Sequence, residues 1–173
     1  IPNSPSLAGS PSELALLGTV AFTVTGLPVF GPNEGAFPDP YGDPVYNDIV
    51  DACLGHTSQG GEYHNHALLA SCIVAGVADD EPDVVVGYAL DGFPIHGPEG
   101  CLDADCSTTA EMQSGWVATG DPTTYAWDNH TYQGGGGDTV LDECNGHTGP
   151  SGDYHYHATD GFPYVMGCVS GVL

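Results

Sequence analysis

Six of the eight histidines in this 173-residue chain lie in two copies of one motif. The first copy spans residues 51–66 and reads DACLGHTSQGGEYHNH, and the second spans residues 142–157 and reads DECNGHTGPSGDYHYH. Every residue of the second copy stands 91 positions after its counterpart, without a gap. This regularity predicts that the two segments fold in the same way and perform related chemistry.

The chemistry that the motif predicts is metal binding. Its last two histidines are two residues apart, and a β-strand places such residues on the same face. The histidine near the start of each copy can supply a third imidazole. Imidazole suits zinc, copper, iron or nickel, and we favour zinc or copper. The predicted ligands are His56, His64, His66, His147, His155 and His157.

Several alternatives remain open at this stage. The six imidazoles can form two separate trios, or both His-x-His pairs can surround a single ion on the axis that relates the copies. The histidines can also be structural and form hydrogen bonds with carboxylates and loop carbonyls. We interpret His96 and His130, which lie outside the repeat, as packing or surface residues. Calcium is a second candidate cation because several loops are acidic. The carboxylates concerned are Asp39, Asp43, Asp79, Asp80, Asp103 and Asp105.

The six cysteines predict three disulfides. Cys53 and Cys144 are equivalent in the repeat, and each is followed by one cysteine in an apolar context. An alternative pairs each of these two thiolates with the histidine three residues later around a metal ion. We favour disulfides because the composition indicates an oxidising compartment. The predicted pairs are Cys53–Cys72, Cys144–Cys168 and the local pair Cys101–Cys106.

The chain has 23 acidic residues and no lysine or arginine. Nucleic acid and anionic membrane surfaces are therefore excluded as expected partners, since no basic side chain can neutralise phosphates. No apolar run approaches the ~20 residues of a membrane span. The first residue, Ile1, is expected for a protein processed after synthesis, and Asn129 begins a sequon for an N-linked glycan. We therefore predict a secreted, extracellular glycoprotein.

Short strands and turns dominate the expected fold. The 26 glycines and 14 prolines disfavour long helices. Residues 20–30 and 84–96 share one hairpin form, and the apolar run 68–75 is typical of a buried strand. We predict a mainly β single domain of two pseudo-symmetric units, sandwich- or barrel-like, with long loops and little helix. The units span about residues 18–76 and 83–173, and an extended Pro/Ser-rich arm, residues 1–17, precedes them.

The second half of the chain resembles the YHYH-domain family of secreted or surface proteins. The residues that support this are YHYHAT at 154–159, GYALDGFPIHGP at 87–98, DECNGHT at 142–148 and FPYVMGC at 162–168. The first half shares the resemblance through internal repetition, although Asn65 stands where the second copy has Tyr156. The resemblance implies an extracellular or surface location.

Together these features favour a structural protein over an enzyme. We expect a metal-binding building block of an extracellular surface layer or fibre, in which the arm adds a strand to the next subunit and the chain self-associates into a homopolymer. One alternative is a metalloenzyme, a hydrolase or oxidase, built on a histidine trio. Another is a metal-capture protein. No serine-nucleophile motif and no phosphate-binding loop supports an enzyme of another class.

Overall fold

The computed structural model describes residues 1–134 and 137–173. The described residues form fourteen strands, one short α-helix and one 3-10 helix, which confirms the mainly β prediction. The first unit and the arm contain β1 (Leu7–Glu13), β2 (Thr19–Thr23), β3 (Pro28–Phe30), β4 (Gly55–Thr57), β5 (Tyr63–Asn65) and α1 (Ala70–Ile73). The second unit contains β6 (Val85–Ala89), β7 (Pro94–His96), β8 (Glu99–Cys101), β9 (Thr109–Glu111), β10 (Trp116–Ala118), η1 (Ala126–Asn129), β11 (His130–Tyr132), β12 (Gly146–Thr148), β13 (Tyr154–His157) and β14 (Cys168–Gly171).

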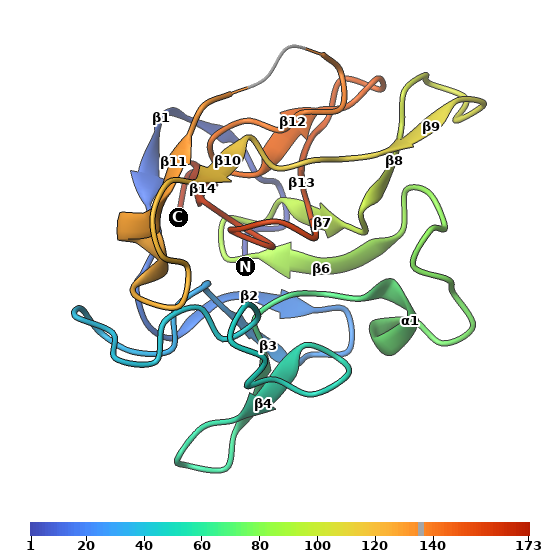
Figure 1. Ribbon diagram of the computed structural model, residues 1–173. Helices are drawn as coiled ribbons and strands as arrows, with labels where there is room; N and C mark the ends of the chain where they lie inside the picture. The colour runs from blue at the N-terminus through green and yellow to red at the C-terminus, as the bar shows by residue number, and fades with distance from the viewer. Residues whose placement is uncertain (135–136) are drawn as a thin grey trace.

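Eight strands form one mixed sheet in the order β12-β13-β7-β6-β2-β3-β5-β4. The central pair, β2 and β6, is antiparallel, and Phe22 lies opposite Tyr88, its counterpart 66 positions later. The pairs on either side, Ala21–Ala89 and Thr23–Gly87, exchange when the two units are interchanged. A pseudo-twofold axis therefore passes through the Phe22–Tyr88 pair, and the predicted internal symmetry is confirmed. Figure 1 shows the first unit as the lower half of the molecule and the second as the upper half.

The two central hairpins have matching three-residue loops. The backbone N–H of Thr23 donates to the carbonyl of Leu27, and that of Ala89 donates to the carbonyl of Phe93. Each loop ends in a glycine with positive φ, Gly26 or Gly92, which is the conformation that this loop type requires and that glycine adopts without a steric penalty. The hairpins set β3 beside β5 and β7 beside β13, both in parallel.

One sequence prediction is wrong: the apolar run 68–75 contains the helix α1 and no strand. The backbone N–H and the hydroxyl of Ser71 both donate to the carboxylate of Asp79, at 2.8 and 2.9 Å. Ala70 and Ile73, three residues apart, are buried on one face of the turn. A side-chain interaction with a later loop residue therefore favours a helical turn here, which the apolar composition alone does not reveal.

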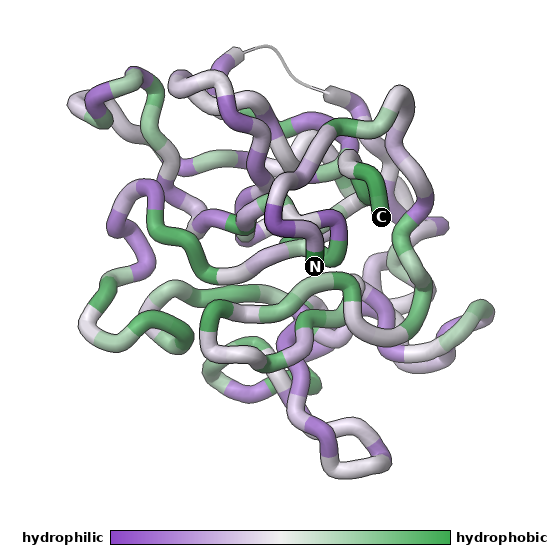
Figure 2. The backbone as a smooth tube through the Cα atoms, turned by 180° about the vertical axis from the view of Figure 1, so that it is seen from behind, coloured by the Kyte–Doolittle hydropathy of each residue, from purple (hydrophilic) through white to green (hydrophobic). Residues whose placement is uncertain are grey.

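The hydrophobic core is built from residues of both units. Among its fully buried side chains are Tyr156, Ile95 and Val29. Figure 2 shows hydrophobic residues concentrated along the central strands, whereas the loop between β4 and β5 that extends at the bottom is mostly polar. No helix in the described part of the chain is long and apolar enough to cross a membrane.

Three disulfides link Cys53 to Cys72, Cys101 to Cys106 and Cys144 to Cys168. These are the predicted pairs, two from the repeat and one local, and no cysteine of the described residues is free. Three disulfides in a domain of this size indicate an oxidising environment.

The N-terminal arm lies on its own chain. Its strand β1 pairs antiparallel with the C-terminal strand β14, with Leu7 opposite Gly171 and Glu13 opposite Cys168. Six of the seven residues of β1 are exposed, whereas all four residues of β14 are buried. The arm therefore covers the edge of β14 through its backbone, and Figure 1 shows β1 beside the second unit, from which the chain runs down to β2 in the first unit.

Candidate metal centres

The repeated residues other than histidine build the loop that positions the first copy of the motif. The carboxylate of Asp51 accepts hydrogen bonds from the backbone N–H groups of Cys53 and Gly55, at 2.8 and 3.3 Å. The Tyr63 hydroxyl donates to the same carboxylate at 3.0 Å. A Cβ atom on Gly55 would lie 2.5 Å from that hydroxyl, so only glycine fits here. The loop thus holds β4 against β5.

The second copy uses the same contacts. The carboxylate of Asp142 accepts from the backbone N–H groups of Cys144 and Gly146, at 2.9 and 3.0 Å, and from the Tyr154 hydroxyl at 2.9 Å. The residue before the glycine, Asn145, has a positive φ, as Leu54 has in the first copy. The identical turns explain why the two segments keep the same length without a gap.

Strand pairing then brings the histidines together. In the first copy His56 lies opposite His64 across the β4–β5 pair, and in the second His147 lies opposite His155 across the β12–β13 pair. The third histidine follows two residues later on the same face, as strand geometry requires. The structure therefore forms two separate histidine groups rather than one shared site.

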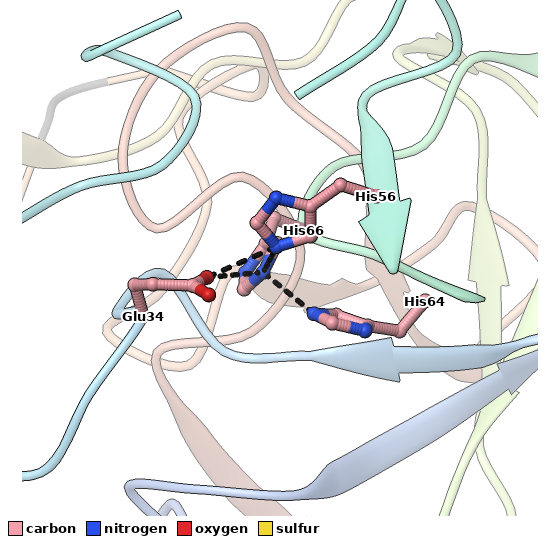
Figure 3. A group of neighbouring side chains, drawn as sticks. All are labelled: Glu34, His56, His64 and His66. Carbon is pink, nitrogen blue, oxygen red and sulfur yellow. Dashed lines mark hydrogen bonds and ion pairs between the residues drawn. The ribbon is translucent and has the colours of Figure 1, made fainter. Parts of the chain in front are cut away.

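The first group consists of His56, His64, His66 and a fourth residue, Glu34 (Figure 3). The Nε2 atom of His66 lies 3.2 Å from that of His56 and 3.1 Å from that of His64. The Oε2 atom of Glu34 lies 3.0 Å from His56 Nε2 and 3.3 Å from His66 Nε2. His64 and His66 are buried, whereas His56 and Glu34 are partly exposed.

The second group consists of His147, His155 and His157. The Nε2 atom of His155 lies 3.0 Å from each of the other two, and those two are 3.2 Å apart. His157 is fully buried, and the other two are partly exposed. In the described part of the chain, these two groups are the sets of three or more potential ligand atoms that lie close together.

The hydrogen bonds of the Nδ1 atoms show which nitrogen faces the centre of each group. His66 Nδ1 lies 2.7 Å from the carbonyl oxygen of Gly31, and His157 Nδ1 lies 2.7 Å from that of Gly97. A carbonyl can only accept, so Nδ1 carries the hydrogen and Nε2 of the neutral ring keeps a lone pair. Several lone pairs that converge within 3.2 Å repel one another unless a cation lies between them.

Burial keeps the imidazoles in the neutral form that binds metals. Burial lowers the pKa of His157 to about 2 and that of His147 to about 4. The pKa values of His64 and His155 are also lowered, chiefly by burial. In the first group the neighbouring His66 side chain holds the pKa of Glu34 below its ordinary value, so this carboxylate is ionised at neutral pH.

The ligand spacing fits a tetrahedral transition metal ion. Metal–nitrogen bonds of ~2.0–2.1 Å separate tetrahedral ligand atoms by roughly 3.3 Å, close to the 3.0–3.2 Å between the Nε2 atoms of the second group. The hydrogen bonds from Nδ1 to carbonyls are the outer contacts that orient metal-bound histidines. The donors are three nitrogens and a carboxylate in the first group and three nitrogens in the second, a set that suits zinc or copper.

Glu34 was not among the predicted ligands, and His96 has a more specific position than the sequence indicated. Glu34 completes the first group from the loop after β3. His96, which we interpreted as a packing or surface residue, stacks on His155 with ring centroids 4.3 Å apart. In the first unit Phe30 stacks on His64 in the same way, at 4.0 Å. The sequence could have indicated this position of His96, because His96 stands 66 positions after Phe30, and the same spacing relates the two hairpins.

The other predicted sites have different surroundings. His130 is partly exposed, and its ring stacks on that of Phe162 with centroids 4.1 Å apart. Of the acidic residues proposed for calcium, Asp43 is fully buried and accepts the Tyr164 hydroxyl at 2.6 Å. The Asn129 amide nitrogen donates to Thr124 Oγ1 and to the Tyr125 carbonyl, at 2.7 and 2.8 Å. A glycan on this nitrogen would have to displace one of these hydrogen bonds, and it stays a prediction.

The comparisons with known proteins give one match. A family model described as "YHYH protein" matches residues 1–171, which is nearly the whole chain. No curated protein and no solved structure matches it.

Proposed function

The chain belongs to the YHYH protein family, and we propose that it is a secreted, metal-binding structural domain that builds an extracellular surface layer or fibre through its N-terminal arm. The three disulfides support an extracellular location. The two histidine groups support bound metal, which would stabilise a domain made mostly of short strands and loops.

The observation that carries the structural role is the pairing of β1 with β14. The pairing uses backbone groups, and the β1 side chains are almost all exposed, so the contact does not depend on which copy supplies the arm. Residues 14–18 between β1 and β2 form a connection without regular structure. If the arm pairs with β14 of a neighbouring copy, each chain gives one arm and receives another, and the assembly grows without closing.

A second candidate function is a metalloenzyme, and one observation favours it. The second histidine group offers three protein ligands, which is the number typical of catalytic metal sites, whereas structural sites usually have four. A metal-capture protein is the third candidate, because both groups use ligands that bind transition metals tightly.

Metal content tests the first part of this proposal. We expect the desalted native protein to hold two transition metal ions per chain, one in each histidine group. The double variant H155A/H157A should hold one ion, because the first group is built from a different part of the sheet. Mass spectrometry of the intact protein under native conditions measures both. A native protein that holds no metal would contradict the proposal and make the histidines a hydrogen-bonded part of the fold.

Deletion of residues 1–13 tests the second part. The shortened chain is expected to remain folded through its disulfides and metal, and to form no fibres or layers in electron micrographs. A synthetic peptide of residues 1–13, added to the full chain, should shorten the assemblies because it occupies β14 without extending the polymer. Normal assemblies from the shortened chain would show that the arm is not the connection between subunits.

A further inference from the structure

The two histidine groups differ in the residue at the position of a fourth ligand. In the first unit the chain leaves β3 and reaches Glu34, whose carboxylate lies 3.0 Å from His56 Nε2. The residue 66 positions later, at the same place after the second hairpin, is Gly100, which has no side chain. The first group therefore has a protein ligand at a position where the second has none from this segment.

The space beside Gly100 is already filled by an apolar side chain. A Cβ atom on Gly100 would lie 3.1 Å from His157 Cε1 and 2.5 Å from the methyl group of Met112, which is fully buried. No carboxylate can extend from here toward His157. Instead the chain continues through β8 into the loop that is closed by the disulfide between Cys101 and Cys106.

This loop forms one wall of a cavity beside the second group. The cavity has a volume of about 560 Å³, and its lining includes the rings of His96 and His155. A smaller hollow of about 290 Å³ borders His147, and Cys101 and Pro150 line both spaces. Of the two partly exposed imidazoles of the second group, His155 thus lines the larger space and His147 the smaller one.

We propose that the metal ion held by His147, His155 and His157 keeps one coordination position open to this cavity and binds there the amine or imidazole nitrogen of a small molecule, whereas the ion beside Glu34 is closed. The proposal rests on the metal binding proposed above. It assigns different roles to the two halves of a repeat: the first site stabilises the fold, and the second exchanges a ligand.

The charges around the cavity select a nitrogen donor over an anion. Three carboxylates, Asp83, Asp103 and Asp153, line it, and the whole chain has a net charge of −23 without a lysine or arginine. Hydrogen bonds from Thr108 and Ser107 hold the pKa of Asp103 below its ordinary value, so this group is charged at neutral pH. Such a wall repels anions, so a neutral nitrogen donor, which has a lone pair available for the metal, is favoured over them.

The wall of the cavity is also more polar than the same place in the first unit. His96 replaces the Phe30 ring, and its Nδ1 atom lies 2.7 Å from Asp83 Oδ1. An apolar stacking partner covers His64, whereas a polar one anchored by a carboxylate stands against His155. This change favours a bound polar molecule beside the second site.

The test uses the protein loaded with two equivalents of cobalt(II), whose visible absorption reports a change in coordination. Metal content is measured before any ligand is added, so that a failure to bind metal, which would overturn the proposed function as well, is recognised separately. Imidazole is then titrated, and azide is titrated in parallel. We expect the native chain to bind one imidazole per two cobalt ions, and to bind azide about tenfold more weakly.

Variants assign the ligand to its site. The double variant H64A/H66A, which leaves the first group with two of its four ligands, should hold one cobalt ion and still bind one imidazole, whereas H157A should bind none. E34A should bind a second imidazole because it opens the first site, whereas the control E81A, which removes an exposed carboxylate elsewhere, should bind only one. The variant D153N removes one negative charge from the wall but retains the backbone carbonyl that lies 3.2 Å from His155 Nδ1. It should therefore reduce the difference in affinity between imidazole and azide.

Three results would overturn the inference. A native chain that binds two imidazoles would show that the sites are equivalent. A native chain that holds two cobalt ions but binds no imidazole would show that the position is filled, and recovery of binding in M112L would identify the methionine sulfur as its occupant. Azide binding as tight as imidazole binding would contradict the proposed ligand class.

Discussion

Removal of the metal ions that we propose for the two histidine groups is expected to lower the melting temperature of this protein by roughly 16–32 °C. A ligand present at about 1,000 times its dissociation constant stabilises the fold by about 4 kcal/mol per site, and each kcal/mol corresponds to about 2–4 °C in a chain of this size. The lone pairs that converge in each group repel one another in the metal-free fold, and relief of this repulsion is one reason to expect tight metal binding. Differential scanning calorimetry with and without chelator measures the shift.

A matched control separates metal loss from other effects of the chelator. The variant H64A/H66A/H157A leaves only two ligands in each group and should melt near the temperature of the chelated native protein. Addition of chelator to this variant should change little. If the native protein melts at the same temperature with and without chelator, the metal does not stabilise the fold, and the proposed structural role of the metal is wrong.

The repeat explains how much of the site could be predicted. The spacing of His64 and His66, and of their counterparts, placed each pair on one strand face. The structure shows how the predicted third histidine joins each pair, by direct pairing across two strands. The choice between one shared ion and two separate ions depended on the position of the pseudo-twofold axis. That axis passes through Phe22 and Tyr88, which the motif itself does not contain.

The unpredicted residues come from contacts that are distant in sequence. Glu34 reaches the first group because β3 runs parallel to β5, and parallel pairing of strands far apart in sequence leaves no local periodicity. The helix α1 forms because Asp79 accepts hydrogen bonds from Ser71, eight residues earlier. In both places the local structure depends on a side chain from another segment, and the hydrophobic pattern of the sequence does not reveal that contact.

The arm illustrates a different limit. Proline and serine in residues 1–12 predicted an extended segment with little core, and β1 is extended and exposed. Extended character does not decide which strand the segment pairs with, because backbone hydrogen bonds are similar for every partner. The edge of β14 is uncovered when the arm leaves, and an uncovered edge promotes pairing between chains.

Of the three disulfides, the one between Cys144 and Cys168 joins the second motif to the C-terminal strand. It ties the loop of the second motif to β14, where the Tyr156 hydroxyl accepts the Ser170 backbone N–H at 2.8 Å. Cys144 is almost fully buried in the core. This bridge therefore links the loop of the second histidine group to the C-terminal strand on which the arm lies. The bridge from Cys101 to Cys106, in contrast, closes a local loop of the insertion.

Replacement of both Cys144 and Cys168 by alanine is accordingly expected to cost about 3–4 kcal/mol, and the same replacement at Cys101 and Cys106 about 2 kcal/mol, since the loops span 24 and 5 residues. The cavity left by two buried sulfurs increases the first loss. Unfolding in urea with saturating metal measures both variants against the native chain. The stabilisation grows with loop length and burial, so the first variant should have the lower urea midpoint. Equal midpoints for the two variants would mean that the arm and the core alone hold β14. The C-terminal strand would then not need its covalent link to the second motif.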